Sequence, residues 1–113
     1  MDTRTFYLKE FMPTVEQALK MIEIEIETAK KEGIKALKVV HGYGSNGIGG
    51  EINKALPNWA KLAKKKKLIK DFIKGTEWII DSEKVLEAKK YCQNLIGDPE
   101  LFFYNPGISI ILI

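Results

Sequence analysis

The stretch Lys38-Val39-Val40-His41-Gly42-Tyr43-Gly44-Ser45-Asn46-Gly47-Ile48-Gly49-Gly50 decides the fold of this chain. It opens on two apolar β-branched residues, crosses a polar loop rich in glycine, and enters the segment 51–63, in which Ile52, Leu56 and Ala60 recur at helical spacing. This pattern predicts a strand, a tight loop and the start of a helix. Glycines permit positive φ and close approach to the backbone, and the first turn of a helix has free N–H groups. The loop therefore suits an anion.

His41 is the one histidine in the chain, and it stands at the exit of the predicted strand. From there its side chain can reach whatever the loop holds, and an imidazole can act as a general base. The alternative is that the glycines serve only the turn. We predict that phosphate groups contact the loop at Gly42, Tyr43, Gly44, Ser45, Asn46 and Gly47, with Tyr43 able to stack on a base or sugar.

The same residues resemble the signature of a known family, the Smr (small MutS-related) domains. The segment His41-Gly42-Tyr43-Gly44 matches the family's His-Gly-x-Gly motif and is followed by apolar residues at Ile48, Ile52 and Leu56. The resemblance implies a nucleic-acid-binding domain, and several members are endonucleases of DNA repair, recombination or RNA processing. It also implies an α/β fold, a single-domain α/β sandwich with a β-α-β-α-β-β core.

Size and composition agree with one such domain over residues 1–113. The chain is 45% hydrophobic and 29% charged, which is ordinary for a soluble globular protein. The single cysteine, Cys92, excludes an internal disulfide and a cysteine-based zinc site. No leader segment and no run of about 18 apolar residues is visible, so we expect a cytoplasmic protein with no membrane partner.

The positive charge is concentrated in the second half of the chain. Residues 1–56 hold eight basic and eight acidic side chains, whereas residues 57–113 hold ten basic and seven acidic ones, which accounts for the net charge of +3. Within that half, the run 61–70 has six lysines and no acid. We predict that Lys64, Lys65, Lys66 and Lys67 form a cationic track for DNA or RNA. A solvated face that only keeps the protein soluble is the alternative.

The remaining elements follow from periodicity and from capping residues. Thr14 and Gln17 form a capping box for a long amphipathic helix that Gly33 ends. Pro57 either kinks the second helix or makes it restart at Asn58. Further strands are expected at 6–8, 36–40 and 68–73, a short β-prone run at 78–80, a third helix from Asp81-Ser82 to Gly97, a turn at 105–107, and an interior strand at 108–113.

Two departures from the family bear on chemistry. Members commonly carry Leu-Asp-x-His or Leu-Asp-x-Arg at the end of the first strand, and here Tyr7 replaces the acid while Lys9 stands near the basic position. After the loop, the usual Leu-Arg becomes Ile48-Gly49, so one cation is missing. His41 and Lys9 are the catalytic candidates, as base and as stabiliser of developing charge. We predict no assembled metal site. Mg²⁺ is implied only if the protein is a nuclease, and Asp71 and Glu51 are then the candidate carboxylate ligands, although the sequence does not place them near the loop.

Other readings of the sequence stay open. The spacing Gly42-x-Gly44-x-x-Gly47 also satisfies a dinucleotide-binding fingerprint, but Asp71 lies within a predicted strand rather than at its end, where the ribose needs an acid. A protein-interaction domain would use the aromatic run 101–104. Residues 75–106, with their extra helix, exceed what the family needs and are interpreted as an insertion before the last strand. A monomer and a weak homodimer are both compatible with the sequence.

Overall fold

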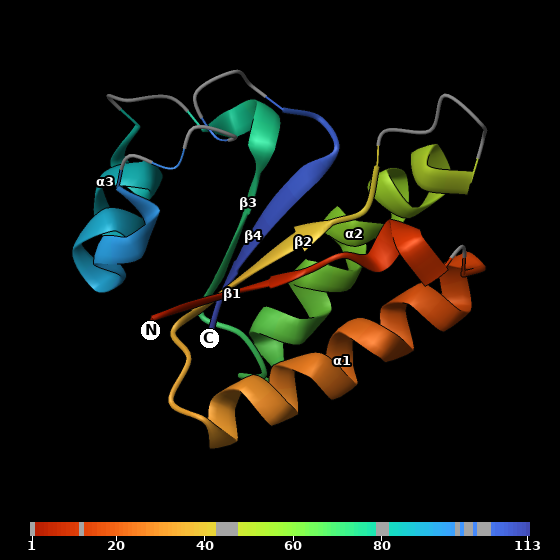
Figure 1. Ribbon diagram of the computed structural model, residues 1–113, viewed down its shortest axis with the longest axis horizontal. Coiled ribbons are helices and arrows are strands. Elements are labelled where there is room, and N and C mark those ends of the chain that lie inside the picture. Colours follow the sequence, from red (N-terminus) through yellow and green to blue (C-terminus); the bar gives the residue numbers. More distant parts are fainter. Residues whose placement is uncertain are drawn as a thin grey trace.

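A four-stranded mixed sheet organises the protein in the computed structural model, which describes residues 2–11, 13–42, 48–78, 82–96, 98, 101 and 105–113. The strand order is β1-β2-β4-β3, with β1 parallel to β2 and β4 antiparallel to both of its neighbours. The expected α/β core, with a helix inserted before the last strand, is confirmed (Figure 1). In chain order, with η for 3₁₀ helices, the elements are β1 Thr3–Phe6, η1 Leu8–Phe11, α1 Val15–Lys31, β2 Ala36–Val40, α2 Ile48–Lys65, β3 Asp71–Lys74, η2 Gly75–Glu77, α3 Glu83–Tyr91, η3 Gln93–Leu95 and β4 Ile108–Leu112.

Each face of the sheet is covered by its own apolar cluster. Helices α1 and α2 pack on one face, and α3 with the segments around it packs on the other (Figure 1). Successive side chains of a strand point to opposite faces, so Leu37 and Val39 join the first cluster while Ala36 and Val40 join the second. Every residue of β2 and β4 is buried, as expected for strands interior to the sheet.

Helix α1 begins and ends as its sequence predicts. The Thr14 hydroxyl accepts a hydrogen bond from the Gln17 backbone N–H (3.2 Å), and the Gln17 side chain accepts one from the Thr14 N–H (3.0 Å), which completes the capping box. Gly33 follows the helix with φ +75°. Ala18, Ile22, Ile26 and Ala29 form its buried face, as the periodicity indicates.

The first strand differs from the sequence-based expectation, and the course of α2 decides between the two alternatives given for Pro57. The first strand is β1 at Thr3–Phe6 rather than 6–8, because the chain turns into η1 after Phe6 and thereby buries Leu8 completely. Helix α2 runs without a restart through Pro57, since Ile52, Leu56 and Ala60 hold both sides of the proline against the core. Burial of an apolar face outweighs the lost hydrogen bond.

The third helix is shorter than expected. Helix α3 ends at Tyr91, and Cys92 leads into η3, although the residues predicted to be buried, Val85, Ala88, Cys92 and Leu95, are all buried. Strand β3 is likewise shorter than the expected 68–73. Trp78 is buried but is not part of a strand, and Ile79 and Ile80 lie outside the described residues. The turn at 105–107 is confirmed, with Gly107 N–H donating to the Asn105 side chain at 2.9 Å.

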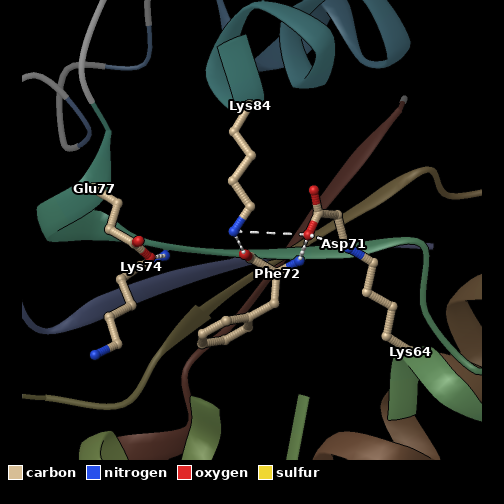
Figure 2. Close-up of polar contacts among 6 residues, drawn as sticks. All are labelled: Lys64, Asp71, Phe72, Lys74, Glu77 and Lys84. Atoms are coloured by element: carbon tan, nitrogen blue, oxygen red, sulfur yellow. Dashed lines mark hydrogen bonds and ion pairs between the residues drawn. The ribbon is translucent and has the colours of Figure 1, made fainter. Parts of the chain in front are cut away.

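The exposed edge of the sheet, at β3, is closed by side chains (Figure 2). Phe72 pairs with Ile111 of β4, yet its N–H donates to Asp71 Oδ1 (2.8 Å) and its carbonyl accepts from Lys84 Nζ (2.7 Å), so both groups point away from β4. The Lys74 N–H donates to Glu77 Oε1 at 3.1 Å. These side chains form hydrogen bonds with the backbone groups that another strand would otherwise pair with.

Candidate nucleic-acid interface

The base of the glycine loop is held by His41, which follows β2. Its Nδ1 donates to the Gly42 carbonyl at 2.7 Å, because a carbonyl can only accept, and its Nε2 lies 2.9 Å from the Ser109 hydroxyl of β4. With the proton on Nδ1, Nε2 is the acceptor and Ser109 is the donor. The His41 side chain is 1% exposed and Ser109 is equally buried, so both ring nitrogens are engaged inside the protein.

The environment of His41 keeps the imidazole neutral. Burial, the larger effect, lowers its pKa from the ordinary value, and the hydrogen bond to the Gly42 carbonyl opposes that shift. A neutral histidine whose nitrogens are both bonded within the chain positions the backbone at the start of the loop. Its predicted role as a catalytic base stays a prediction.

Lys9 borders the start of the glycine loop. It belongs to η1, which packs beside the end of β2 (Figure 1), and it is exposed. A Cβ built on Gly42 would lie 3.9 Å from Lys9 Cβ and 4.0 Å from Lys9 Cδ, so the lysine side chain borders the loop. Gly42 has φ +77°, a conformation that favours glycine. The fold therefore brings Lys9 and Gly42 together from segments more than 30 positions apart in sequence.

Two exposed aromatic side chains flank Lys9 in the sequence. Tyr7 is 47% exposed and Phe11 is 62% exposed, and the Phe11 ring lies 6.1 Å from that of Phe6. Exposed aromatic rings beside a cation are suited to stacking on bases. In the sequence, Tyr7 was noted only as the replacement of an acid, and neither Phe11 nor Ser109 was identified. The aromatic residues on both sides of Lys9 are the sequence feature that could have indicated a surface for stacking.

Part of the predicted loop contact is not covered by the structure. Tyr43, Gly44, Ser45, Asn46 and Gly47 lie outside the described residues, as do the aromatic residues at 102–104. Helix α2 begins directly after the loop, at Ile48, so its first turn lies at the same end of the sheet as Gly42 and Lys9 (Figure 1).

The predicted lysine track lies at the other end of α2. Lys64 and Lys65 are in the last helical turn, Lys66 and Lys67 follow it, and all four are exposed. A helix of 18 residues is about 27 Å long at 1.5 Å per residue, so the loop and the track are separated by the length of α2. The two halves of the predicted interface do not form one compact site.

An exposed stripe with three lysines runs along α2 from Lys54 to the track, whereas the first turn of the helix carries the exposed acid Glu51. Lys54, Asn58, Lys61 and Lys65 are exposed and recur at intervals of four, three and four residues, which places them on one side of the helix. Residues 52–70 contain seven lysines and no acidic residue. Sequence reasoning identified the final lysines but not the stripe, because the stripe depends on α2 being continuous through Pro57.

Of the two carboxylates considered for Mg²⁺, Glu51 lies in the first turn of α2, and Asp71 lies away from the loop. Asp71 pairs through β4 with the start of β2, whereas His41 follows its end, so the two residues lie at opposite ends of the sheet. The Asp71 carboxylate contacts Lys64 (3.3 Å) and Lys84 (3.8 Å) (Figure 2). Among the described residues, no group of three or more His, Cys, Asp or Glu side chains is arranged to hold a metal ion. Asp71 is also at the wrong end of β3 to bind a ribose in a dinucleotide site.

Comparison with known proteins identifies the family. The model of the Smr domain matches residues 10–78, more than half of the chain and including the loop and α2. The chain therefore belongs to the Smr domain family, which supports a nucleic-acid-binding or nuclease-like domain in general. Comparisons with curated proteins and with solved structures gave no match. In the part of the chain that the structure describes, no helix is long and apolar enough to cross a membrane.

Proposed function

We propose that this Smr domain binds DNA or RNA along helix α2, from the glycine loop to the lysine track. In this arrangement the loop residues 42–47 and Lys9 contact phosphates at one end, and Lys64, Lys65, Lys66 and Lys67 contact them at the other. The uninterrupted positive charge of residues 52–70 is the observation that carries the proposal. Phosphate contacts of this kind position a nucleic acid without reading its sequence.

The charge of the neighbouring helix supports this orientation. The exposed positions of α1 include Glu16 and Glu27, with Glu23 and Glu25 partly exposed, and Arg4 is occupied by ion pairs to Glu25 and Glu32. An acidic surface repels phosphates. A nucleic acid is therefore expected on the α2 side of the pair of helices.

An endonuclease is the second candidate, and the position of Lys9 beside Gly42 favours it. A cation there would stabilise charge that develops on a phosphate. His41 could act as a base only if its ring left Ser109 and turned toward solvent, and Tyr7 occupies the position of the family's acid. We therefore propose binding as the main activity, with weak nicking as the subordinate one.

The remaining expectations stay part of the proposal. We propose one Smr-like domain over residues 1–113, with 75–106 as an insertion, that works in the cytoplasm as a monomer or weak homodimer. The insertion contributes α3, which covers the second face of the sheet and lies away from the loop (Figure 1).

The test is a titration of supercoiled plasmid and of labelled RNA, with Mg²⁺ and with chelator, that follows both retardation and nicking. We expect retardation without metal, and its loss in a Lys54→Ser/Lys61→Ser variant. The matched control is Lys20→Ser/Lys31→Ser, which removes the same charge from exposed positions of α1. Equal retardation by the two variants would contradict binding along α2.

Nicking that requires Mg²⁺ and disappears in Lys9→Ala and His41→Ala would establish the endonuclease. Absence of any retardation at low salt would leave a protein-interaction domain as the remaining reading.

A further inference from the structure

A basic depression lies at the end of α2 that is remote from the glycine loop. It has a volume of about 430 Å³ and is lined by Lys30, Lys64, Lys67, Leu68, Ile69, Lys70 and Ile113. The four lysines come from the last turn of α1, the last turn of α2 and the connection to β3. Neither the loop nor the α2 stripe explains this grouping, because Lys30 and Lys70 belong to neither.

The charge in the depression is compensated only in part, with the Lys70 ammonium 5.3 Å from the centre of the Tyr91 ring. None of the lining residues is acidic. Lys64 contacts Asp71 at 3.3 Å, but Asp71 Oδ1 also lies 3.8 Å from Lys84 and accepts the Phe72 N–H. Within the described parts of the chain, Lys30 and Lys67 form no ion pair. Four cations that line one concave surface raise its positive potential and favour a bound anion.

The backbone at Lys67 supplies a second, independent observation. Helix α2 ends with Leu68 N–H donating to the Ala63 carbonyl (2.9 Å) and Lys67 N–H to the Lys64 carbonyl (3.1 Å), a Schellman motif with Lys67 at φ +61°.

Helix α1 ends in the same motif, with Ile34 N–H bonded to Ala29 (3.0 Å) and Gly33 N–H bonded to Lys30 (3.1 Å). In α1 the left-handed position is occupied by glycine, which adopts it without strain. In α2 the same position is occupied by lysine, whose Cβ disfavours that conformation. The strained residue is thus one whose side chain lines the depression.

Interaction with the helix dipoles explains only part of this lysine set. Lys30 and Lys64 lie in last helical turns, where a cation is favourable next to unpaired carbonyls. Lys67 and Lys70 lie beyond the end of α2, and glycine would adopt the left-handed conformation at position 67 with less strain than lysine.

We infer that Lys30, Lys64, Lys67 and Lys70 form a site for a phosphate-bearing anion with two or more negative charges, such as a phosphomonoester or a diphosphate. The volume exceeds that of one phosphate, and Leu68, Ile69 and Ile113 give the site an apolar wall for the group that carries the phosphate. The site shares Lys64 and Lys67 with the proposed nucleic-acid interface, but it can be tested separately, because it requires only that a free phosphate compound bind.

The experiment measures binding of pyrophosphate to the full chain by calorimetry at constant ionic strength. We expect saturable binding at one site, weakened at least tenfold by Lys30→Gln, since a hydrogen bond to a charged group is lost. Lys31→Gln is the matched control: it removes the neighbouring charge from the same helical turn without touching the depression. Failure of pyrophosphate to bind, or equal weakening by both variants, would overturn the site.

Lys67→Gly separates binding from folding. The substitution relieves the left-handed strain, so we expect an unchanged or higher melting temperature together with a similar loss of pyrophosphate binding. Wild-type affinity in this variant would overturn the role of Lys67 and with it the argument from strain.

Two oligonucleotides distinguish the sources of the phosphate. If the ligand is the end of a nucleic acid, a 5′-phosphorylated oligonucleotide binds more tightly than its 5′-hydroxyl form, and pyrophosphate abolishes the difference. If the ligand is a small phosphorylated compound, pyrophosphate binds and the two oligonucleotides do not differ. Both results support the site, and both remain measurable if retardation of nucleic acids by the α2 stripe is absent.

Discussion

The role that the sequence suggests for His41 differs from the role that its surroundings in the fold indicate. In the sequence it is a histidine beside a glycine loop, which suggests a catalytic base. In the fold its two nitrogens join the Gly42 carbonyl and the Ser109 hydroxyl, and the ring is buried. A side chain in this position stabilises the junction of β2, the loop and β4.

The lowered pKa of His41 predicts how stability depends on pH. The unfolded chain takes up a proton near the ordinary histidine pKa of about 6.5, whereas the folded chain takes it up only at lower pH. The contribution of neutral His41 is therefore complete above about pH 6.5 and is lost as the pH falls below that value. Urea denaturation at pH 7.5 and pH 5.0 should show a larger loss of unfolding free energy for the wild type than for His41→Gln. An equal loss in both proteins would contradict this origin.

At the scale of elements, a buried ion pair joins the segment between η3 and β4 to the centre of the sheet. Lys38 of β2 is 6% exposed, and its Nζ lies 3.0 Å from Asp98 Oδ2, between η3 and β4. A lysine inside a central strand requires such a partner, because an isolated buried charge is costly. The pair thus joins residues 60 positions apart.

Asp98→Ala should lower the free energy of unfolding by about 3 kcal/mol, because it leaves the Lys38 charge buried with one partner fewer. Lys38→Met combined with Asp98→Ala should restore much of that loss, since neither charge of this pair then remains. Chemical denaturation of the wild type, both single variants and the double variant measures the coupling. Additive losses in the double variant would show that the pair does not interact.

The edge of β3 yields a second prediction at this scale. The side chains of Lys84 and Glu77 form hydrogen bonds with backbone groups of β3 that face away from β4 (Figure 2). Replacing both, as Lys84→Met/Glu77→Ala, should free the edge and promote pairing of β3 between two molecules.

Light scattering during size-exclusion chromatography should detect a larger species for this variant at high protein concentration. Lys90→Met/Glu87→Ala, which changes the same residue types at exposed positions of α3, is the control. A variant that stays the size of the wild type would argue against the protective role of these side chains.

At the scale of the whole molecule, charge is divided between two neighbouring helices. The α2 side is basic from Lys54 to Lys70, and the α1 side is largely acidic. On the proposed function, this division would orient a polyanion before any specific contact forms, because long-range attraction acts on the whole surface.

The salt dependence of duplex binding should report this arrangement. Each phosphate neutralised by a lysine contributes a slope of about −0.9 in a plot of log affinity against log salt concentration. Lys54→Ser/Lys61→Ser should reduce the slope by about two units, whereas Lys20→Ser/Lys31→Ser should leave it unchanged. A slope that does not differ between the wild type and the α2 variant would show that the stripe makes no phosphate contact.

The sequence by itself determined the order of elements, the cap and end of α1, the interior position of β4, and the family. These properties follow from local rules: a capping box, a helical period and a continuous apolar run act within a few residues. Lys9 was predicted to stand near the basic position of the family motif, and the fold places it beside Gly42.

Only the tertiary structure decided how the functional residues are grouped. Burial of His41 depends on Ser109, which is 68 residues away, and the depression joins Lys30 to Lys67 and Lys70 through the packing of α1 on α2. The boundaries of β1 and α2 were likewise set by burial of Leu8 and Leu56, which outweighed local preference. Contacts between distant segments depend on how whole faces pack, and no local pattern in the sequence contains that information.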